Sequence, residues 1–315
     1  MNPPSAAGGD AAAAPVRALV LVAHGASARL RLAGGEVVLA RLARRGLQCV
    51  CGDEVLCGSD RQHSQWQVRE VCARRSALFR SNARGRAELV AANLTLLVAV
   101  VAPRPEPDLF LVDRYLAAAA SASIGVLLLA NKTDQAYTAP LRAELATLEA
   151  CGCAVLHCSA RSGAGLDALR ERLQGETVML VGQSGVGKSS LLRQLVPGAD
   201  AAVGELLKGE AGRHTTSAAQ LYALPGGGAL IDSPGVRDFA PAPDMLDERT
   251  LGFAEVAAHA PQCRFVDCRH MREPGCAVRA AVEAGAISPR RYESYRRLRR
   301  LREQLLERMP RAPRR

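Results

Sequence analysis

Short stretches in which apolar and polar side chains alternate follow an alanine-rich start of the chain. Five of them, separated by turn-forming residues such as Gly34 and Gly35, cover residues 17–22, 28–32, 36–42, 49–56 and 65–71. Alternation with a period of two predicts half-buried strands, and five short strands in succession favour a small β-barrel such as an OB-fold. We expect this barrel over residues 15–88, after a disordered tail of residues 1–14.

The pattern then changes to continuous apolar runs that alternate with helical periodicity. Helical patterns cover residues 109–122 and 166–173, and the apolar runs that flank them cover residues 94–101, 124–130, 154–158 and 177–181. Such alternation predicts a doubly wound parallel sheet, with ligand-binding loops at the carboxyl ends of its strands. We therefore expect a central α/β domain at residues 89–240. A mostly helical region should follow at residues 241–315, ending in a basic helix over about 289–308.

A phosphate-binding loop of the form G-x-x-x-x-G-K-[ST] follows the apolar run at 177–181 and precedes a helical stretch. Its glycines let backbone N–H groups converge on phosphates at a helix N-terminus, Lys188 bridges the β- and γ-phosphates, and Ser189 ligates Mg²⁺. The expected phosphate-binding residues are Gly182, Gln183, Ser184, Gly185, Val186, Gly187, Lys188, Ser189 and Ser190.

A guanine-reading motif, Asn131-Lys132-Thr133-Asp134, ends the apolar run at 124–130. The carboxylate of Asp134 can accept hydrogen bonds from N1–H and the 2-amino group of guanine, whereas adenine leaves it facing an unprotonated N1. Asn131 is expected to help seat the base and Lys132 to pack its stem along the ring. Ser159 and Ala160, which follow the next apolar run, complete the predicted base pocket.

The order of these motifs is inverted, because the guanine-reading motif normally follows the phosphate loop and here precedes it by fifty residues. The second half of a GTPase fold is therefore written first. We interpret the central domain as a circularly permuted P-loop GTPase.

Two further motifs are assigned to Mg²⁺ and the γ-phosphate. Asp232 ends an apolar run 44 residues after Lys188 and is expected to hold Mg²⁺ through water, while the Gly235 N–H faces the γ-phosphate. Between the phosphate loop and Asp232, Thr215 is the predicted switch threonine and a Mg²⁺ ligand, with Thr216 as the less favoured alternative.

Many GTPases orient the attacking water with a glutamine immediately after this glycine, but here the position holds Val236. We therefore expect slow intrinsic hydrolysis that a partner accelerates, and we assign His214, Lys188 and Thr215 as catalytic candidates. A loop histidine without a catalytic part is an equally good interpretation of His214.

Ten cysteines in a chain without an export signal read as thiols or metal ligands rather than disulfides. The pairs Cys49/Cys51 and Cys151/Cys153 are explained as small apolar side chains on one strand face. A further group provides three thiolates and one imidazole within fourteen residues, which suits one structural Zn²⁺; buried free cysteines are the alternative. Its members are Cys263, Cys268, His270 and Cys276.

The net charge of +10 is concentrated at the two ends of the chain. Residues 288–315 hold eleven Arg against three Glu, and residues 1–90 hold thirteen Arg against seven acidic residues. Two basic ends favour a large polyanion, most simply RNA, although solvated basic faces are an alternative. Without an apolar run long enough to span a membrane, we expect a cytoplasmic protein with no membrane partner.

Taken together, the motif order and the C-x4-C-x-H-x5-C spacing resemble the ribosome small-subunit-dependent GTPase family of bacteria, over about residues 16–308. The resemblance implies a late role in maturation of the small ribosomal subunit, rRNA binding and GTP hydrolysis stimulated by the subunit. It also implies a hydrolytic part for the switch histidine that matches His214. The stretch at residues 209–212 departs from the basic glycine-rich run expected there. We expect a monomer; the alternative function is an RNA-binding assembly protein with a vestigial nucleotide site.

Overall fold

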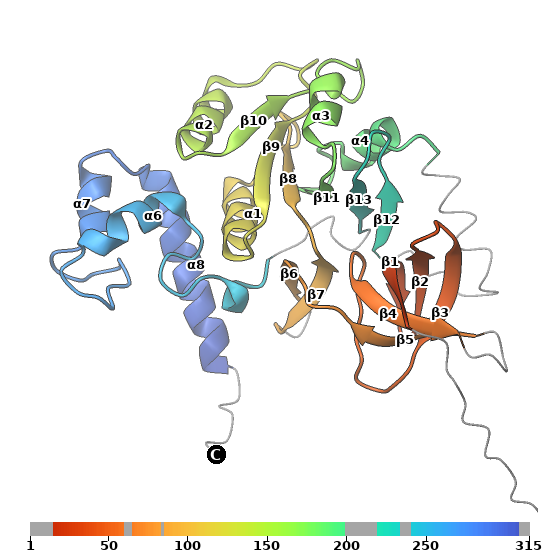
Figure 1. Ribbon diagram of the computed structural model, residues 1–315. Helices are drawn as coiled ribbons and strands as arrows, with labels where there is room; N and C mark the ends of the chain where they lie inside the picture. The colour runs from red at the N-terminus through yellow and green to blue at the C-terminus, as the bar shows by residue number, and fades with distance from the viewer. Residues whose placement is uncertain (1–14, 60–64, 83–84, 199–218, 234–240, 309–315) are drawn as a thin grey trace, which may run out of the picture.

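The computed structural model describes residues 15–59, 65–82, 85–198, 219–233 and 241–308. The predicted tail of residues 1–14 lies outside them, as do His214, Thr215, Gly235 and Val236. Figure 1 shows three parts in a row: a barrel at the right, a sheet with helices at the centre and a helical region at the left.

The N-terminal part is a closed barrel of five strands, as predicted. The strands are β1 (Val16–His24), β2 (Ser27–Leu32), β3 (Val37–Leu42), β4 (Glu54–Ser59) and β5 (Trp66–Val71). They pair in the order β1-β2-β3-β5-β4, and β4 closes the barrel on β1. Alternate side chains such as Val20, Leu30, Val55 and Val68 fill its interior. The alternation of apolar and polar residues in the sequence therefore reflects strands with one face in the barrel interior, as predicted.

The fourth strand differs from its predicted range, because residues 49–53 form a turn. Gly52 takes a φ of +89°, and the Val50 N–H donates to the Asp53 carboxylate at 2.8 Å. That carboxylate is fully buried and also accepts from Arg74 at 2.7 Å. Cys49 and Cys51 thus precede β4, and their predicted place on one strand face is wrong. The other pair, Cys151 and Cys153, likewise flanks a glycine turn before its strand.

A two-stranded hairpin that the sequence did not predict joins the barrel to the central sheet. It consists of β6 (Ala77–Ser81) and β7 (Ala87–Ala92). Residue 88, where the sequence placed the end of the barrel domain, lies within β7. The Asn93 side chain ties its end to both neighbours, since it accepts from the Arg75 N–H and donates to the Gly52 carbonyl. The hairpin is therefore anchored against the barrel turn.

The central sheet is built from β8 (Leu96–Val101), β9 (Gly125–Ala130), β10 (Ala154–His157), β11 (Thr177–Val181), β12 (Gln220–Ala223) and β13 (Ala229–Asp232). Its order is β10-β9-β8-β11-β13-β12, with every neighbouring pair parallel except β12–β13. Helices α1 (Leu109–Ser121) and α2 (Ala139–Ala150) pack on one face, and α3 (Leu166–Arg172) and α4 (Lys188–Leu195) on the other. This is the predicted doubly wound arrangement. The sheet also continues into the barrel, because Val22 of β1 pairs with Gln220 of β12.

The C-terminal region packs against α1 and is mostly helical, as predicted. Its elements are the short 3₁₀ turns η2 (Pro243–Met245) and η3 (Ala260–Gln262) and the helices α6 (Ala254–His259), α7 (Ala277–Glu283) and α8 (Pro289–Arg308). Tyr295 and Leu298 of α8 are fully buried. The basic helix is therefore part of the core of this region.

Buried ion pairs hold α8 against the central domain. Asp113 of α1 is 1% exposed and accepts from Arg290 and Arg291, each at 2.6 Å. Arg291 also pairs with Glu255 of α6 at 2.7 Å, and Arg290 with Glu144 of α2 at 2.6 Å. Although burial lowers the pKa of Arg291, the two carboxylates outweigh it and raise that pKa above its ordinary value. Arg290 and Arg291 thus form ion pairs that connect α8 to α1, α2 and α6.

Candidate nucleotide and metal sites

The phosphate loop connects β11 to α4 at the carboxyl edge of the sheet. Gly182 has a φ of +140°, and a side chain there would collide with the carbonyl of Val100. Gly187 has a φ of +102°, and a side chain there would collide with the Asn131 amide. Gly187 precedes α4 without a side-chain cap. The first amides of that helix are therefore directed at the position where the motif expects phosphates.

Lys188 folds back over this loop. Its ammonium donates to the carbonyls of Gly182 at 2.6 Å and Gln183 at 2.7 Å. The positive charge thus stands beside the loop whose amides converge on the same space. Gln183 connects the loop to α1, because its side-chain oxygen accepts from the N–H of Asp108, the N-cap residue of that helix, at 2.8 Å.

The guanine-reading motif is attached to the phosphate loop by its first two residues. Asn131 is 1% exposed and donates to the Val186 carbonyl at 2.8 Å, while its oxygen accepts from the Ala160 N–H at 3.1 Å. Lys132, at a φ of +64°, donates to the Gly185 carbonyl at 2.7 Å and to the Arg104 carbonyl at 2.8 Å. Asn131 and Lys132 therefore connect the guanine-reading motif to the phosphate loop, which the spacing of the motifs did not reveal.

Asp134 lies beside the second predicted base-binding segment. Its carboxylate accepts from the Ser159 hydroxyl at 2.6 Å, and Arg161 lies 4.0 Å away. The Ser159 hydrogen bond is the main reason that the pKa of Asp134 falls below its usual range. Ser159 is in turn held by the Ser162 N–H at 3.1 Å. The acceptor needed for guanine is therefore charged and held in place.

The remaining predicted nucleotide residues are brought to the same edge. The Thr133 N–H donates to the Cys158 carbonyl at 3.1 Å, which aligns the loops after β9 and β10. Ser184, Ser189 and Ser190 are exposed on the loop and on α4. Asp232 ends β13, the parallel neighbour of β11. Ser189, in the first turn of α4, and Asp232, at the end of β13, thus provide a hydroxyl and a carboxylate, a donor set suited to Mg²⁺.

Two contacts in this site escaped sequence reasoning. The segment after β8 lies against the phosphate loop, where the backbone carbonyl of Arg104 accepts from Lys132 and a side chain on Gly185 would touch Pro105. Arg161 stands near Asp134. The proline-rich run at 103–107 after a buried strand, and the position directly after Ser159-Ala160, were the available signals.

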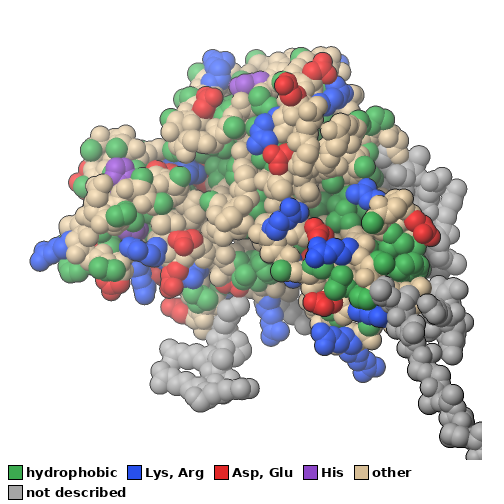
Figure 2. Space-filling model, in the orientation of Figure 1, with side chains coloured by type: hydrophobic (Ala, Val, Ile, Leu, Met, Phe, Trp, Pro, Cys, Tyr) green, Lys and Arg blue, Asp and Glu red, His purple; other side chains and the backbone are tan. Residues whose placement is uncertain are grey.

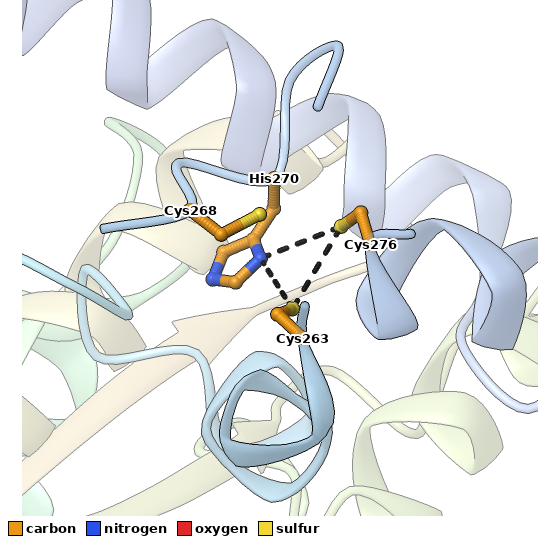
Figure 3. A group of neighbouring side chains, drawn as sticks. All are labelled: Cys263, Cys268, His270 and Cys276. Atoms are coloured by element: carbon orange, nitrogen blue, oxygen red, sulfur yellow. Dashed lines mark hydrogen bonds between the residues drawn. The ribbon is translucent and has the colours of Figure 1, made fainter. Parts of the chain in front are cut away.

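The predicted metal ligands converge at one place (Figure 3). Cys263 follows η3, Cys276 precedes α7, and Cys268 and His270 come from the loop between them. The His270 Nδ1 lies 3.4 Å from the Cys263 sulfur and 3.5 Å from the Cys276 sulfur, and these two sulfurs are 4.0 Å apart. All four ligand atoms lie within 4.8 Å of one another.

The separations among the ligand atoms of His270, Cys263 and Cys276 are close to those of a tetrahedral site. Ligand bonds of about 2.0 Å for nitrogen and about 2.3 Å for sulfur place ligand atoms about 3.5–3.8 Å apart. Burial raises the pKa of Cys268 to about 12 and lowers the pKa of His270. Neutral imidazole is therefore ready to bind, while the buried Cys268 thiol needs a cation to favour its thiolate. The donor set fits one metal ion.

The loop between η3 and α7, residues 263–276, carries the four ligands and is called the metal loop. Groups outside the ligand set hold it in place. Glu273 accepts from the N–H groups of Arg269, Met271 and Arg272 at 2.8–3.0 Å. Burial raises the pKa of Glu273, but these backbone hydrogen bonds outweigh it and lower the pKa to about 2. From α8, Tyr292 donates to the His270 carbonyl at 2.7 Å. The loop is thus supported on both sides of His270.

No helix in the described part of the chain is long and apolar enough to cross a membrane.

Comparisons with known proteins agree with this geometry. The model of the RsgA GTPase family matches residues 71–241, more than half of the chain. A protein of Azotobacter vinelandii named small ribosomal subunit biogenesis GTPase RsgA is 45% identical over 266 residues, covering 83% of this chain and 77% of its own. Its namesake in Pseudomonas aeruginosa (strain LESB58) is 43% identical over 282 residues, covering 88% and 83%.

Two solved structures share the fold across almost the whole chain. YjeQ from Thermotoga maritima has a TM-score of 0.69 at 28% identity, and the match covers 94% of this chain and 100% of that one. YloQ, described as a circularly permuted GTPase, also has a TM-score of 0.69, at 21% identity, with 97% and 100% covered. The permuted order of strands and motifs, the family model and these relatives together show that the chain belongs to the RsgA GTPase family of GTP hydrolases.

Proposed function

We propose that this GTPase acts in late maturation of the small ribosomal subunit, binds its rRNA and hydrolyses GTP faster when bound to it. The observation that carries the proposal is the convergence of the phosphate loop, Asp134, Ser159 and Asp232 at one sheet edge, in a chain whose relatives are named for small-subunit biogenesis. The basic ends of the chain, with a net charge of +10 overall, support a polyanionic partner.

Nucleotide binding follows from the loop and the helix behind it. The amides at the start of α4 and the Lys188 ammonium would bind the phosphates, exchanging the present contacts of Lys188 with Gly182 and Gln183 for phosphate oxygens. Asn131 and Lys132 would keep the loop aligned with the base pocket. Asp134 would then select guanine through two hydrogen bonds.

Hydrolysis depends on charge stabilisation at the γ-phosphate. Mg²⁺ bound with GTP would neutralise developing charge, and Ser189, Asp232 and Thr215 are the residues that would hold it. The Gly235 N–H would face the γ-phosphate, and His214 would orient the attacking water in place of the glutamine that Val236 replaces. These three assignments, Thr215, Gly235 and His214, rest on motif order.

The metal cluster would hold one Zn²⁺ with a structural role. Four protein ligands complete a tetrahedral shell and leave no position for a reacting water. Its expected effect is to fix the loop between η3 and α7 against α8. The protein would work as a cytoplasmic monomer, with GTP, GDP and the subunit as its partners.

A turnover assay tests the proposal. Phosphate release from GTP should be slow for the protein alone and rise by at least roughly tenfold with purified small subunits. Lys188→Ala should abolish both rates. Equal rates with and without subunits would contradict the stimulated activity.

The alternative, an RNA-binding assembly protein with a vestigial nucleotide site, makes a different prediction. It requires subunit binding without measurable hydrolysis under any condition. The intact Lys188, Ser189, Asp232 and Asp134 favour the enzyme. Co-sedimentation with small subunits in GDP and in a non-hydrolysable GTP analogue separates the two, because a vestigial site gives no nucleotide dependence.

A further inference from the structure

A shallow hollow in the C-terminal region is lined by arginines from three separate elements. Arg272 belongs to the metal loop, Arg279 to α7 and Arg296 to α8. The hollow has a volume of about 370 Å³, and its other lining residues are Met271, Val282, Glu283 and Tyr292. In the view of Figure 2, basic side chains stand on the surface of this part of the molecule, at the left.

The arginines of this hollow have more donors than the protein satisfies. The guanidinium groups of Arg272 and Arg279 make no ion pair or hydrogen bond with the described residues. Arg296 pairs with Glu293 at 2.9 Å, yet its Nε is buried without a hydrogen-bond partner among the described residues. Glu283 is the single carboxylate among the lining residues. The hollow therefore has a surplus of positive charge and of N–H donors.

This surplus differs from the other arginines of α8. Arg290 and Arg291 are bound by buried carboxylates, and Arg299 donates to the carbonyls of Glu248 and Arg249, each at 2.7 Å. Their charge or donor groups are used inside the fold. The surface hollow is thus a place where the basic C-terminal segment has binding capacity left over.

We propose that this hollow binds phosphate groups of an RNA backbone, an inference that rests on the proposed function in the small subunit. Arginine forks match phosphate oxygens in two-point hydrogen bonds, and three forks on separate elements can hold successive or opposed phosphates.

The same geometry predicts binding to the RNA backbone rather than to bases. The Tyr292 ring is stacked on Tyr295 at 6.4 Å between centroids, and the Arg296 guanidinium lies 5.8 Å from its centroid. Its hydroxyl is used by the His270 carbonyl. The Tyr292 ring and hydroxyl are thus already engaged by groups of the protein, and contacts to phosphates carry no sequence information.

The test is a double variant, Arg272→Gln with Arg279→Gln, matched by Arg170→Gln with Arg172→Gln on α3. Both remove two charges, but Arg170 and Arg172 already pair with Asp167 and Glu176. Affinity for purified small subunits and for a short RNA duplex is measured across a salt series. We expect the hollow variant to bind roughly tenfold or more weakly at about 0.1 M salt, with a salt slope lower by about two, and the matched variant to resemble the wild type.

Three outcomes overturn the inference. One is wild-type affinity and salt slope in the hollow variant. A second is an equal loss in the matched variant, which would show a general charge effect. The third is wild-type protein that prefers a polyglutamate peptide over the RNA duplex in a manner abolished by the variant, because the partner is then an acidic protein segment.

Zinc content and basal hydrolysis should stay at wild-type values in the hollow variant, since both side chains lack internal partners. If wild-type protein fails to bind small subunits, the proposed function fails. The RNA duplex still decides whether the hollow binds phosphates.

Discussion

Asp134 is positioned by Ser159 rather than by its own loop alone, and the 2.6 Å hydrogen bond keeps it charged. We predict that Asp134→Asn weakens GTP use by at least roughly tenfold and improves use of xanthosine triphosphate, because the amide can donate to the 2-oxo group. The measurement is kcat/KM for both nucleotides. Arg161→Gln is the matched control and should change GTP use far less, since Arg161 lies 4.0 Å from the carboxylate and is 87% exposed. An unchanged nucleotide preference in Asp134→Asn would remove Asp134 from the base pocket.

The motif residues were predictable one by one, but their contacts with one another were not. Spacing identified Asn131 and Lys132 as nucleotide residues, yet their bonds to Val186 and Gly185 join segments more than fifty residues apart. Those bonds form because β9 and β11 run parallel on either side of β8, so that the loops after both strands lie at the same edge of the sheet. Strand order of this kind is a property of packing, which a motif in one segment does not report.

Glu273 supports the metal loop through three backbone amides, and it is not a ligand. We predict that Glu273→Gln releases zinc roughly tenfold faster, because one amide oxygen replaces two charged acceptors and loop support of this kind tunes metal affinity by about 10- to 100-fold. Zinc transfer to a coloured chelator measures the rate. Glu283→Gln, on α7, is the control.

The pH of this experiment follows from the direction of the pKa shift. Folding lowers the pKa of Glu273 from 4.5 to about 2, so its contribution is complete above pH 4.5 and is lost as the pH falls through 2. The difference between variant and wild type should therefore be fully present at neutral pH. Equal release rates there would show that the loop does not depend on the carboxylate.

At the scale of elements, some of the charged residues of α8 form ion pairs inside the protein, which its sequence did not indicate. The sequence predicted its range well, since Pro289 suits a first helical turn. It also assigned its arginines to a polyanion, whereas Arg290 and Arg291 bind Asp113, more than 170 residues away. A count of charges along one segment cannot identify a partner on α1. The basic helix is therefore both a surface element and a core element.

We predict that Asp113→Asn loosens α8 from the central domain. Removing the Asp113 charge breaks its buried ion pairs with Arg290 and Arg291, and it leaves Arg291 with Glu255 as its remaining carboxylate partner. The loss of one partner from a buried pair costs about 3–5 kcal/mol. Hydrogen exchange of α8 amides should accelerate accordingly. Glu144→Gln is the control, because its pair with Arg290 is about one-quarter exposed and should contribute much less. Unchanged exchange in Asp113→Asn would show that apolar packing of Tyr295 and Leu298 alone holds the helix.

Sequence patterns missed the hairpin β6–β7, the helix α2, the strand β12 and the turn at residues 49–53. Strands of five and six residues give little alternation to detect, and Arg74, Arg75 and Arg80 obscured it further. The turn depends on the buried Asp53 carboxylate and its partner Arg74, which are 21 residues apart. Local apolarity therefore predicted a strand where a distant ion pair stabilises a turn.

On the scale of the whole molecule, the barrel and the C-terminal region attach to opposite sides of the central domain (Figure 1). Val22 pairs with Gln220 of β12 on one side, and α8 packs against α1 on the other. The residues that follow Thr215, the predicted switch threonine, in the sequence thus include β12, a strand bonded to the barrel. Those after Gly235 continue into Pro241, which bridges to Arg80 and accepts from Arg114 at 2.8 Å.

This arrangement leads us to predict reciprocal coupling between nucleotide and subunit. If the GTP-bound form is the one that binds the subunit better, small subunits must raise affinity for a GTP analogue over GDP by the same factor, within a typical range of about 5- to 150-fold. Co-sedimentation and nucleotide titration measure the two factors independently.

Arg114→Gln, which loses the bond to Pro241, should reduce both factors together and leave the affinity of the free protein for the GTP analogue unchanged. Arg142→Gln, whose bond to Tyr137 lies away from that junction, should preserve them. Equal subunit affinity in the two nucleotide states would refute the coupling, and reduced factors in Arg142→Gln alone would locate the link elsewhere.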